Sequence, residues 1–413
     1  MILSHPNRQH VWETAVGGQR AGVLLRFFTA MYNTRQGVSR LLGSASQRYR
    51  RRCHPDLDPA LVEAVPWFDW TKQLARGPLR GARLELQSWA NDQFDRTVAR
   101  KLRRYDMATV IHGFEASSLY TFRQGRRMGL ATVLDVPSAT EWFARAVSCE
   151  AAAAGLAPRP ATARWADYLQ RERDLADWLF VGAEQVRRCL MENGVDNRRI
   201  VTIPYAADPA IFRPAAPERQ DGVFRVVFAG HIGLRKGVRH LLEAFSRLRL
   251  SNAELVLIGQ PDADGRALME RYAGVHRWIP SVPQAGLADW FRRSSVFAFP
   301  SLAEGSAFVI YEAMCAGLPV IVSAQSGSVV RDGQDGLILP QVDATNLALA
   351  LQKLFDDRGL ARDMGTSGRQ RILQGFTWQH YQQRLAAAYR AIHRSEDVQA
   401  AVDATLIPLG VPA

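Results

Sequence analysis

The 413-residue chain has few cysteines and no long apolar run, and each absence excludes a class of protein. Its four cysteines are scattered, without the spacing of metal ligands, which argues against a disulfide framework and favours a reducing compartment. No apolar stretch approaches the roughly 18 residues that span a bilayer. The first ten residues also lack the basic and apolar regions of a signal peptide. We therefore expect a cytoplasmic globular protein of two or three domains.

Acidic residues are outnumbered by basic ones, and this excess of basic residues lies mainly in the first half. The formal net charge is +12, and residues 1–215 hold 31 Lys and Arg against 21 Asp and Glu. Basic clusters stand at 48–52, 96–104 and 126–127. One interpretation is a solvated surface, and the other is attraction to an anionic membrane, such as the inner membrane face, or to a phosphate-bearing acceptor. Nucleic acid is not expected, because aromatic residues are not interleaved with the basic runs.

What is present is an alternation of strand and helix patterns, which predicts parallel sheets. In the first half, strands are predicted at 1–4, 23–29, 109–112, 131–135 and 199–204, and a long amphipathic helix at 82–104. In the second half, strands are predicted at 225–229, 254–258, 296–300, 319–323 and 336–339. Helices are predicted there at 238–248, 287–293, 308–316 and 344–355. This pattern predicts two successive α/β units with a ligand cleft between them.

The domain boundaries come from a proline-containing polar stretch at 212–221, which we interpret as a linker. We predict an N-terminal Rossmann-like domain over 1–213 and a second one over 214–377. A long helix follows at 378–394, and residues 395–413 are expected to be a loose tail.

A glycine-rich segment follows the first strand of the second domain. Gly230, Gly233 and Gly237 let the backbone approach a ligand, and the next helix begins with free amides that suit an anion. Arg235 and Lys236 add positive charge at the same place. The spacing fits neither a Walker loop nor a dinucleotide fingerprint. Taken alone, the segment is either a phosphate loop or simply a tight strand-to-helix turn.

Two glutamates follow the strand predicted at 296–300. Glu304 lies in the turn that opens the next helix, and Glu312 lies on that helix seven residues later. A carboxylate can accept hydrogen bonds from adjacent sugar hydroxyls, which makes both residues candidates for binding a sugar or a ribose. The alternatives are that Glu304 only complements the helix dipole and that Glu312 is a surface residue.

Together these segments resemble the family-four retaining glycosyltransferases of the GT-B fold, also called glycosyl transferases group 1. The resemblance covers about residues 170–393 well and the first domain more loosely. It rests on the order of the segments 203–208, 212–214, 230–237, 257–259, 299–301, 304–305, 312–314, 316–320 and 376–378. It implies two Rossmann-like, doubly wound domains that face a central cleft. The helix at 378–394 would cross back to the N-terminal domain.

The resemblance implies roles for residues around the donor diphosphate. Lys236 would bind the diphosphate beside Gly230, and Glu312 would bind the ribose. His231 stands where the family usually has Arg, and we suggest that Arg235 compensates for it.

It also implies roles for residues around the reacting sugar. Glu304 would sit by the donor-sugar hydroxyls, with the backbone amides of Ser306, Ala307, Phe308 and Val309 near the sugar and phosphate. His112, at the end of a strand in the first domain, would lie across the cleft near the reacting carbon, unless it is merely structural. The family often has a glycine pair after its first strand, but Gly17 and Gly18 lie in a helical pattern.

No metal or other cofactor is expected. Glycosyltransferases of the other common fold hold a metal with an Asp-x-Asp pair, and two such pairs occur here. Asp56 and Asp58 lie between prolines in a polar loop with no preceding strand. Asp262 and Asp264 do follow a strand, but behind a turn that the resembled family also has.

The expected function is thus a metal-independent, retaining glycosyltransferase of the hexosyltransferase type. Its donor would be a UDP-, GDP- or ADP-sugar, and its acceptor a hydroxyl of a glycan or of a lipid-linked molecule. Two alternatives remain, which are a sugar-nucleotide epimerase on the same fold and a non-catalytic nucleotide-sugar-binding subunit. The second is motivated by His231.

Overall fold

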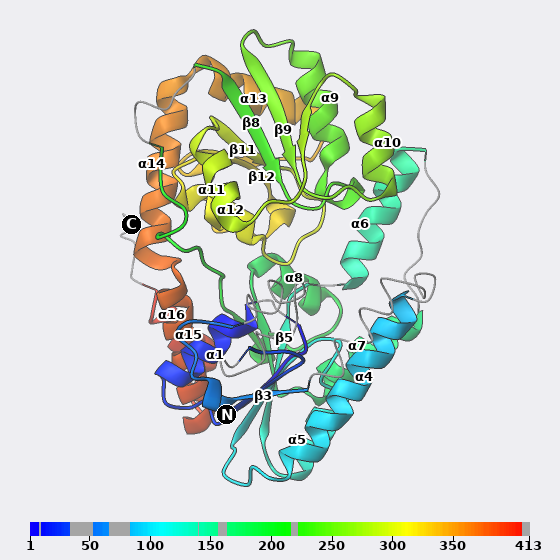
Figure 1. Ribbon diagram of the computed structural model, residues 1–413, viewed down its shortest axis with the longest axis vertical. Coiled ribbons are helices and arrows are strands. Elements are labelled where there is room, and N and C mark those ends of the chain that lie inside the picture. The colour runs from blue at the N-terminus through cyan, green and yellow to red at the C-terminus, as the bar shows by residue number, and fades with distance from the viewer. Residues whose placement is uncertain are drawn as a thin grey trace, which may run out of the picture.

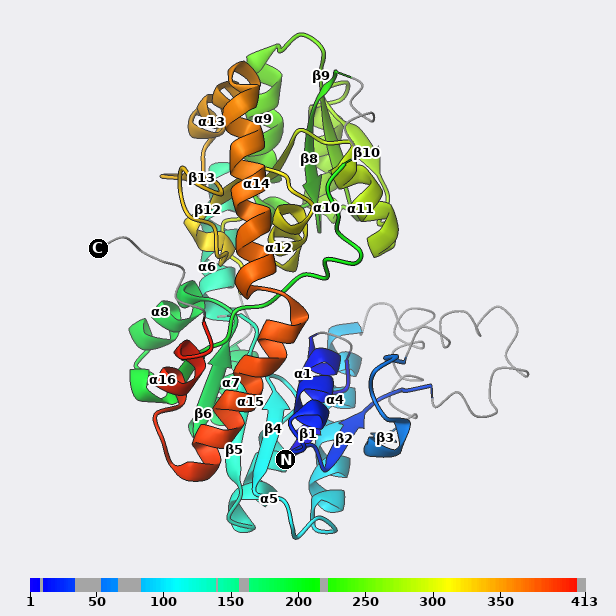
Figure 2. The same ribbon diagram turned by 90° about the vertical axis from the view of Figure 1, so that its left-hand side faces the viewer.

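The computed structural model describes residues 1–7, 10–33, 53–65, 83–138, 140–155, 163–215 and 222–406. They form two parallel β-sheets, one above the other along the long axis of the molecule (Figure 1). Helices lie on both sides of each sheet, as the side view of the upper sheet shows most clearly (Figure 2). The predicted fold of two Rossmann-like domains is therefore confirmed. Among the described residues, no helix combines the length and the apolarity needed to cross a membrane.

The first sheet has seven strands in the order β3-β2-β1-β4-β5-β6-β7. They are β1 (Ile2–Ser4), β2 (Arg26–Thr29), β3 (Val62–Ala64), β4 (Val110–Phe114), β5 (Ala131–Val136), β6 (Trp178–Val181) and β7 (Ile200–Thr202). The helices of this domain are α1 (Val11–Arg20), α4 (Arg83–Leu102), α5 (Leu119–Arg127), α6 (Thr140–Ala153), α7 (Ala163–Leu175) and α8 (Glu184–Glu192). The direction in which successive strands are added reverses between β1 and β4.

The second sheet has six strands in the order β10-β9-β8-β11-β12-β13, and here the reversal falls between β8 and β11. The strands are β8 (Phe224–Ala229), β9 (Ala253–Ile258), β10 (Arg277–Ile279), β11 (Val296–Phe299), β12 (Val320–Ser323) and β13 (Gly336–Leu339). The helices are α9 (Val238–Leu248), α10 (Ala263–Arg271), α11 (Gln284–Arg292), α12 (Phe308–Cys315), α13 (Ala344–Asp356) and α14 (Arg358–Gly375). Two last helices, α15 (Trp378–Arg394) and α16 (Val398–Asp403), return to the first domain.

The central strands of the second sheet are almost entirely apolar because helices cover both of their faces. Every residue of β8, β11 and β12 is buried. The strands predicted at 225–229, 296–300 and 319–323 agree with these three to within one residue. This rigid centre fixes the loops at its carboxyl edge.

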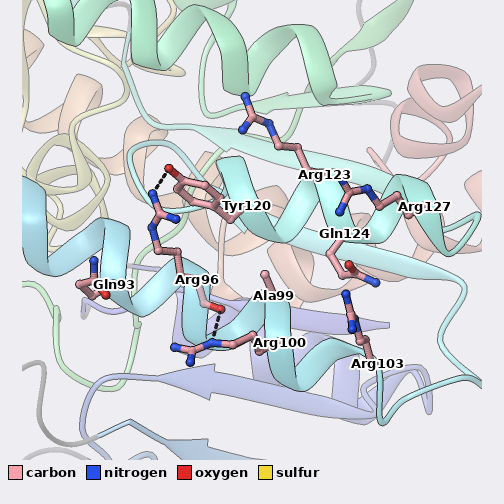
Figure 3. Close-up of a pocket in the computed structure, with 9 residues that line it drawn as sticks. All are labelled: Gln93, Arg96, Ala99, Arg100, Arg103, Tyr120, Arg123, Gln124 and Arg127. Carbon is pink, nitrogen blue, oxygen red and sulfur yellow. Dashed lines mark hydrogen bonds between the residues drawn. The ribbon is translucent and has the colours of Figure 1, made fainter.

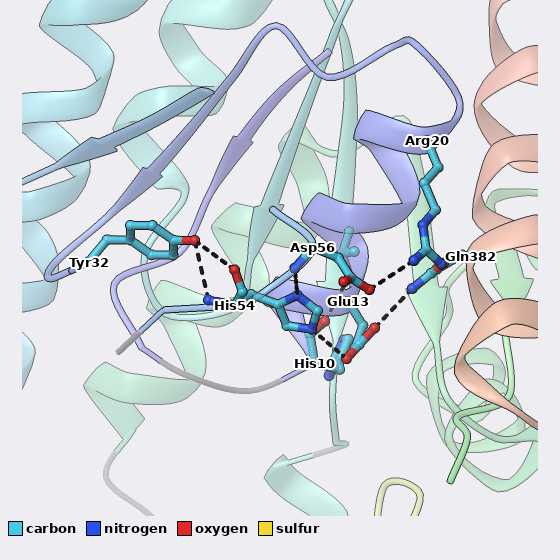
Figure 4. Close-up of polar contacts among 8 residues, drawn as sticks. His10, Glu13, Arg20, Tyr32, His54, Asp56 and Gln382 are labelled. Carbon is cyan, nitrogen blue, oxygen red and sulfur yellow. Dashed lines mark hydrogen bonds and ion pairs between the residues drawn. The ribbon is translucent and has the colours of Figure 1, made fainter. Parts of the chain in front are cut away.

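Helix α15 packs along α1, and polar contacts tie the two helices together (Figure 4). The Gln382 side chain accepts a hydrogen bond from Arg20 at 2.6 Å and donates one to Glu13 at 2.9 Å. Gly17 of α1 faces Gln382 at close range, so a side chain there would push α15 away. Gly17 thus serves the packing of α1 on α15, whereas Gly18 faces Met1 and Leu24.

Two boundary predictions need correction. Phe212, assigned to the first domain, is buried against Phe291 of α11, and its carbonyl accepts a hydrogen bond from Arg369 of α14. The tail expected from 395 contains α16, which packs on α15 and β7 and buries Val398 and Val402. Its two buried residues are only four positions apart, which is too short a pattern to have predicted a helix.

Candidate functional site

The candidate site lies at the carboxyl edge of the second sheet, where the strand order reverses. β8 and β11 are parallel neighbours, with Val226 beside Val296 and Val227 beside Phe297. The chain leaves β8 toward one side of the sheet and leaves β11 toward the other side. Loops that diverge in this way leave a crevice at the strand ends, which is where open α/β sheets bind ligands.

The glycine-rich turn after β8 touches the loop after β11. The turn contains a 3-10 helix over Leu234–Lys236 and ends at Gly237, whose φ of 66° suits glycine. A Cβ at Gly237 would collide with the carbonyl of Pro300. The amide of Leu302 donates to the Arg235 carbonyl at 2.8 Å. The two predicted site segments therefore form one continuous surface.

Three predicted site residues meet on this surface. Lys236 forms an ion pair with Glu304, and Arg235 approaches the same carboxylate oxygen at 3.0 Å. The side chain of Lys236 is 10% exposed, that of Arg235 is 26% exposed and that of Glu304 is 16% exposed. A small ligand could therefore reach all three. Burial lowers the pKa of Lys236 to about 8, although Glu304 acts in the opposite direction. The cluster carries a net positive charge at neutral pH.

Helix α12 points its N-terminus into the same region. Its N-cap is Ala307, which offers no side-chain cap, so its first amides remain available to an anion. The hydroxyl of Ser306 donates a hydrogen bond to the carbonyl of Gly327 at 2.9 Å. The backbone of Ser306 is therefore the part of this residue that could bind a ligand. The ring of Phe308 stacks on Tyr205 of the first domain, with centroids 4.4 Å apart. The four predicted amides thus surround the start of α12.

Glu312 lies on the second turn of α12. Its carboxylate accepts a hydrogen bond from Gln284, the first residue of α11, at 3.2 Å. Burial raises the pKa of Glu312 to about 7. Apart from Gln284, no side chain among the residues that the structure describes donates a hydrogen bond to this carboxylate. Two adjacent hydroxyls of a ligand could therefore supply the hydrogen bonds that its ionised form needs.

His231, next to Gly230, does not take the place of the family's arginine in the structure. Its side chain is half exposed, and its Nε2 lies 3.0 Å from Asp262 Oδ2. Asp262 also caps α10 by accepting a hydrogen bond from the Gly265 amide at 2.7 Å. Arg235, by contrast, lies beside Glu304 and Lys236.

The Asp-x-Asp pairs have structural partners. Besides capping α10, Asp262 pairs with His231, and Asp264 lies in the first turn of that helix. Asp56 pairs with Arg20 at 2.8 Å (Figure 4), and Asp58 caps the 3-10 helix Pro59–Leu61. Within the described ranges, no three His, Cys, Asp or Glu side chains gather in a way that could hold a metal ion.

The position predicted for His112 is wrong. β4 runs two residues beyond His112, which is fully buried in mid-strand between β1 and β5. Its Nδ1 lies 2.7 Å from the Tyr389 hydroxyl of α15, so the ring faces that helix instead of the second domain. Burial lowers the pKa of His112 to about 4. Because β4 continues two residues beyond the predicted end of the strand, a residue expected at the edge of the sheet lies inside it.

The histidine that does approach α12 is His10, which the sequence did not indicate. It precedes α1, and its Nε2 lies 2.8 Å from Asp135 Oδ2 at the end of β5. Its ring centroid is 6.1 Å from that of Phe308. No motif surrounds His10 in the sequence, so only the fold could reveal its position.

Helix α6 was also missed, although it brings the first domain against the glycine-rich turn after β8. The Arg235 guanidinium lies 4.7 Å from the Phe143 ring centroid. Glu150 pairs with Arg239 at 2.5 Å and with His240 at 3.2 Å, both of them on α9. These partners are 89 and 90 positions apart in the sequence, so local patterns gave no signal.

A third contact brings the two domains together beside Glu304. Gly305 has no room for a Cβ, because the carbonyl of Pro137 at the end of β5 occupies that space. The loop that carries Glu304 is thus in direct contact with the strand edge of the first domain.

Comparisons with known proteins identify related sequences. Residues 212–371 match the family model described as glycosyl transferases group 1. The D-inositol 3-phosphate glycosyltransferase of Kribbella flavida is 31% identical over 226 residues, which is 51% of this chain and 52% of that protein. The MMP alpha-(1->4)-mannosyltransferase of Mycolicibacterium hassiacum is 27% identical over 59% of this chain and 62% of that protein. The chain spans about half to three fifths of the length of these relatives.

Solved structures share the whole fold. Sucrose-phosphate synthase from Thermosynechococcus elongatus has a TM-score of 0.62 and 18% identity, covering 96% of this chain and 99% of that one. Anabaena HepE in complex with UDP and glucose has a TM-score of 0.64 and 12% identity, covering 94% and 99%. The chain has the GT-B fold, and its residues 212–371, which include the glycine-rich turn and both glutamates, match the family model of the glycosyl transferases group 1.

Proposed function

We propose that the protein is a retaining, metal-independent glycosyltransferase that moves a sugar from a nucleoside diphosphate to an acceptor hydroxyl. The observation that carries the proposal is the convergence at the β8/β11 reversal. There Arg235, Lys236 and the amide end of α12 meet around one small surface. A diphosphate needs such a concentration of donors and positive charge, which here comes from the chain itself.

In this proposal the diphosphate becomes the partner of Lys236 and Arg235. Both cations are held by Glu304 in the structure, which keeps them oriented toward the ligand position. Glu304 is then free to accept hydrogen bonds from the donor sugar, while Glu312 binds the ribose hydroxyls. As the glycosidic bond breaks, negative charge grows on the departing diphosphate, and the cations and amides stabilise it.

The acceptor is proposed to bind between the two domains, near Pro137 and α6. Its hydroxyl attacks the anomeric carbon from the side of the leaving diphosphate and gives its proton to a departing phosphate oxygen. The new glycosidic bond therefore keeps the anomeric configuration of the donor. No histidine base is required, which agrees with the burial of His112. Close contact between the domains would exclude water and protect the donor from hydrolysis.

We also propose a cytoplasmic location. All four cysteines are free, as expected of a reducing compartment. The identity of the acceptor is best sought among glycans and lipid-linked molecules, because the positively charged first domain favours anionic partners.

The proposal is tested in two steps. A thermal-shift screen of UDP, GDP, ADP and their sugars should raise the unfolding temperature for one nucleotide family, because ligand binding stabilises the folded state. The selected donor is then incubated with candidate acceptors while release of free nucleoside diphosphate is measured. Acceptor-dependent release is expected, with the product bond in the donor's own configuration. A product with inverted configuration would refute the retaining mechanism.

Two results of the same assay would favour other functions. Conversion of the donor sugar without any acceptor would identify an epimerase. Tight donor binding without turnover for every acceptor would favour a non-catalytic binding subunit. This alternative has a specific observation behind it, because His231 contacts Asp262. An excess of EDTA should leave the rate unchanged, and a loss of activity that Mg²⁺ or Mn²⁺ restores would refute metal independence.

A further inference from the structure

The outer face of the first domain carries a row of exposed arginines. Arg96, Arg100 and Arg103 are spaced by four and three residues, which places them on one stripe of α4 and the turn after it. Arg123 and Arg127 stand one helical turn apart on the neighbouring helix α5. Figure 3 shows the arginines of the two helices around a common groove. The groove has a volume of about 530 Å³, and no carboxylate lines it.

The charge of this arginine groove is largely uncompensated. Arg96 is paired with Asp92 at 2.7 Å and lies 3.8 Å from the ring centroid of Tyr120, which fixes its position. Arg100 bonds only within its own helix, to the Arg96 carbonyl and the Thr97 hydroxyl, both at 3.3 Å. Among the described residues, no ion pair is recorded for the remaining three arginines. A guanidinium without a carboxylate partner is well suited to bind phosphate.

Two exposed apolar side chains stand before and after the same stripe in the sequence. Trp89 lies on α4 seven residues before Arg96 and is 50% exposed. Met107, four residues after Arg103, is 83% exposed. Together they are two of the six large apolar side chains that are exposed in the described part of the chain. At membrane interfaces, basic side chains attract anionic headgroups while aromatic and aliphatic side chains enter the acyl boundary, and Trp89 and Met107 offer apolar anchors of that kind.

We propose that this face of α4 and α5 docks the protein on a phospholipid surface that carries anionic headgroups. The arginines of the groove pair with lipid phosphates, and Met107 and Trp89 enter the boundary of the acyl region. The apolar flanks favour a lipid surface over a soluble polyanion, which would gain nothing from them. The site is separate from the β8/β11 loops, so docking does not depend on the proposed glycosyl transfer.

The test is co-sedimentation with vesicles in the absence of nucleotide. The wild-type chain should bind phosphatidylcholine vesicles that contain about 30 mol% phosphatidylglycerol and should not bind pure phosphatidylcholine. The triple variant Arg100→Gln, Arg103→Gln, Arg127→Gln should bind the anionic vesicles roughly a hundredfold more weakly. Met107→Ser should weaken binding by roughly threefold, since it removes a single apolar anchor.

A matched control removes the same charge elsewhere. Arg271, Arg362 and Arg390 are exposed and lie outside the arginine groove. Their triple change to Gln should leave vesicle binding within about twofold of wild type, because surface potential acts only over about a Debye length. Equal losses in the two triple variants, or no binding by the wild-type chain, would overturn the proposal. So would binding of inositol hexakisphosphate by the groove without any binding of vesicles. Circular dichroism and thermal melting of each variant verify that it is folded.

Discussion

The two domains are built alike, but the loops at their strand reversals are filled differently. After β8 and β11, the loops present two cations and a helix N-terminus that remain partly exposed. After β4 and β5, the charged side chains are buried and paired within the domain, as for Glu115 with Arg173 at 2.8 Å and Asp135 with His10. The comparison teaches that the fold provides an edge for a ligand, whereas the side chains there decide whether a charged ligand can enter.

The largest expected effect on turnover belongs to the strand edge of the second domain. Lys236→Ala should lower the turnover number by roughly a hundredfold or more, since it removes a cation from the leaving diphosphate. Turnover is measured as acceptor-dependent release of nucleoside diphosphate at saturating donor. Lys353→Ala, at an exposed position on α13, is the matched control and should keep full activity. Near-normal turnover of Lys236→Ala would remove this residue from the site.

The buried histidine of the first domain should behave in the opposite way. His112→Ala leaves a cavity and a Tyr389 hydroxyl without its partner, so the free energy of unfolding should fall by about 2 kcal/mol. Turnover of the folded protein should change little. Urea unfolding and the nucleotide-release assay measure the two quantities, and Tyr389→Phe should cost about half as much stability. A large drop in turnover with unchanged stability would restore a catalytic role for His112.

These two residues also show what the sequence could and could not predict. In the second domain, five of the six strands were predicted because they contain apolar runs, and the ends of β8 and β11 set the positions of Lys236 and Glu304. The short, largely exposed strand β10 and the helices α10 and α14 were missed. In the first domain the strand end was misplaced by two residues, which moved His112 from the core to the edge. The roles of α6 and His10 depend on contacts between distant segments, which no local pattern encodes.

A smaller effect is expected for Glu304, which contacts both cations and is proposed to bind the donor sugar. Glu304→Gln keeps the shape of the side chain but removes the charge that holds Lys236 and Arg235. Turnover should fall by roughly tenfold, and discrimination between donor sugars should weaken. Rates for two donors with the same base and different sugars measure both changes. An unchanged rate together with unchanged donor choice would exclude Glu304 from the sugar subsite.

The smallest expected effect is a pH dependence of donor binding, which again involves residues of the second domain. Lys236, with a pKa lowered to about 8 by burial, loses its charge as the pH rises through that value, so diphosphate binding weakens. Glu312, with a pKa raised to about 7, gains a proton as the pH falls through that value and becomes a poorer acceptor for the ribose. The dissociation constant of the donor should therefore be lowest between these values and rise roughly threefold on either side.

Calorimetric titrations from pH 5.5 to 9.5 would follow this profile. Lys236→Arg should abolish the alkaline limb, because guanidinium stays charged throughout. Glu312→Gln should abolish the acid limb. A flat profile for the wild-type protein would show that neither group senses the donor.

The most direct test of the whole account is a crystal structure of the protein with the nucleoside diphosphate selected by the thermal-shift screen. The pyrophosphate should lie between the Gly230–Gly237 turn and the first amides of α12, within hydrogen-bond distance of Lys236 Nζ, with the ribose beside Glu312. Pyrophosphate density at any other place, such as the groove between α4 and α5, would contradict the assignment of the donor site.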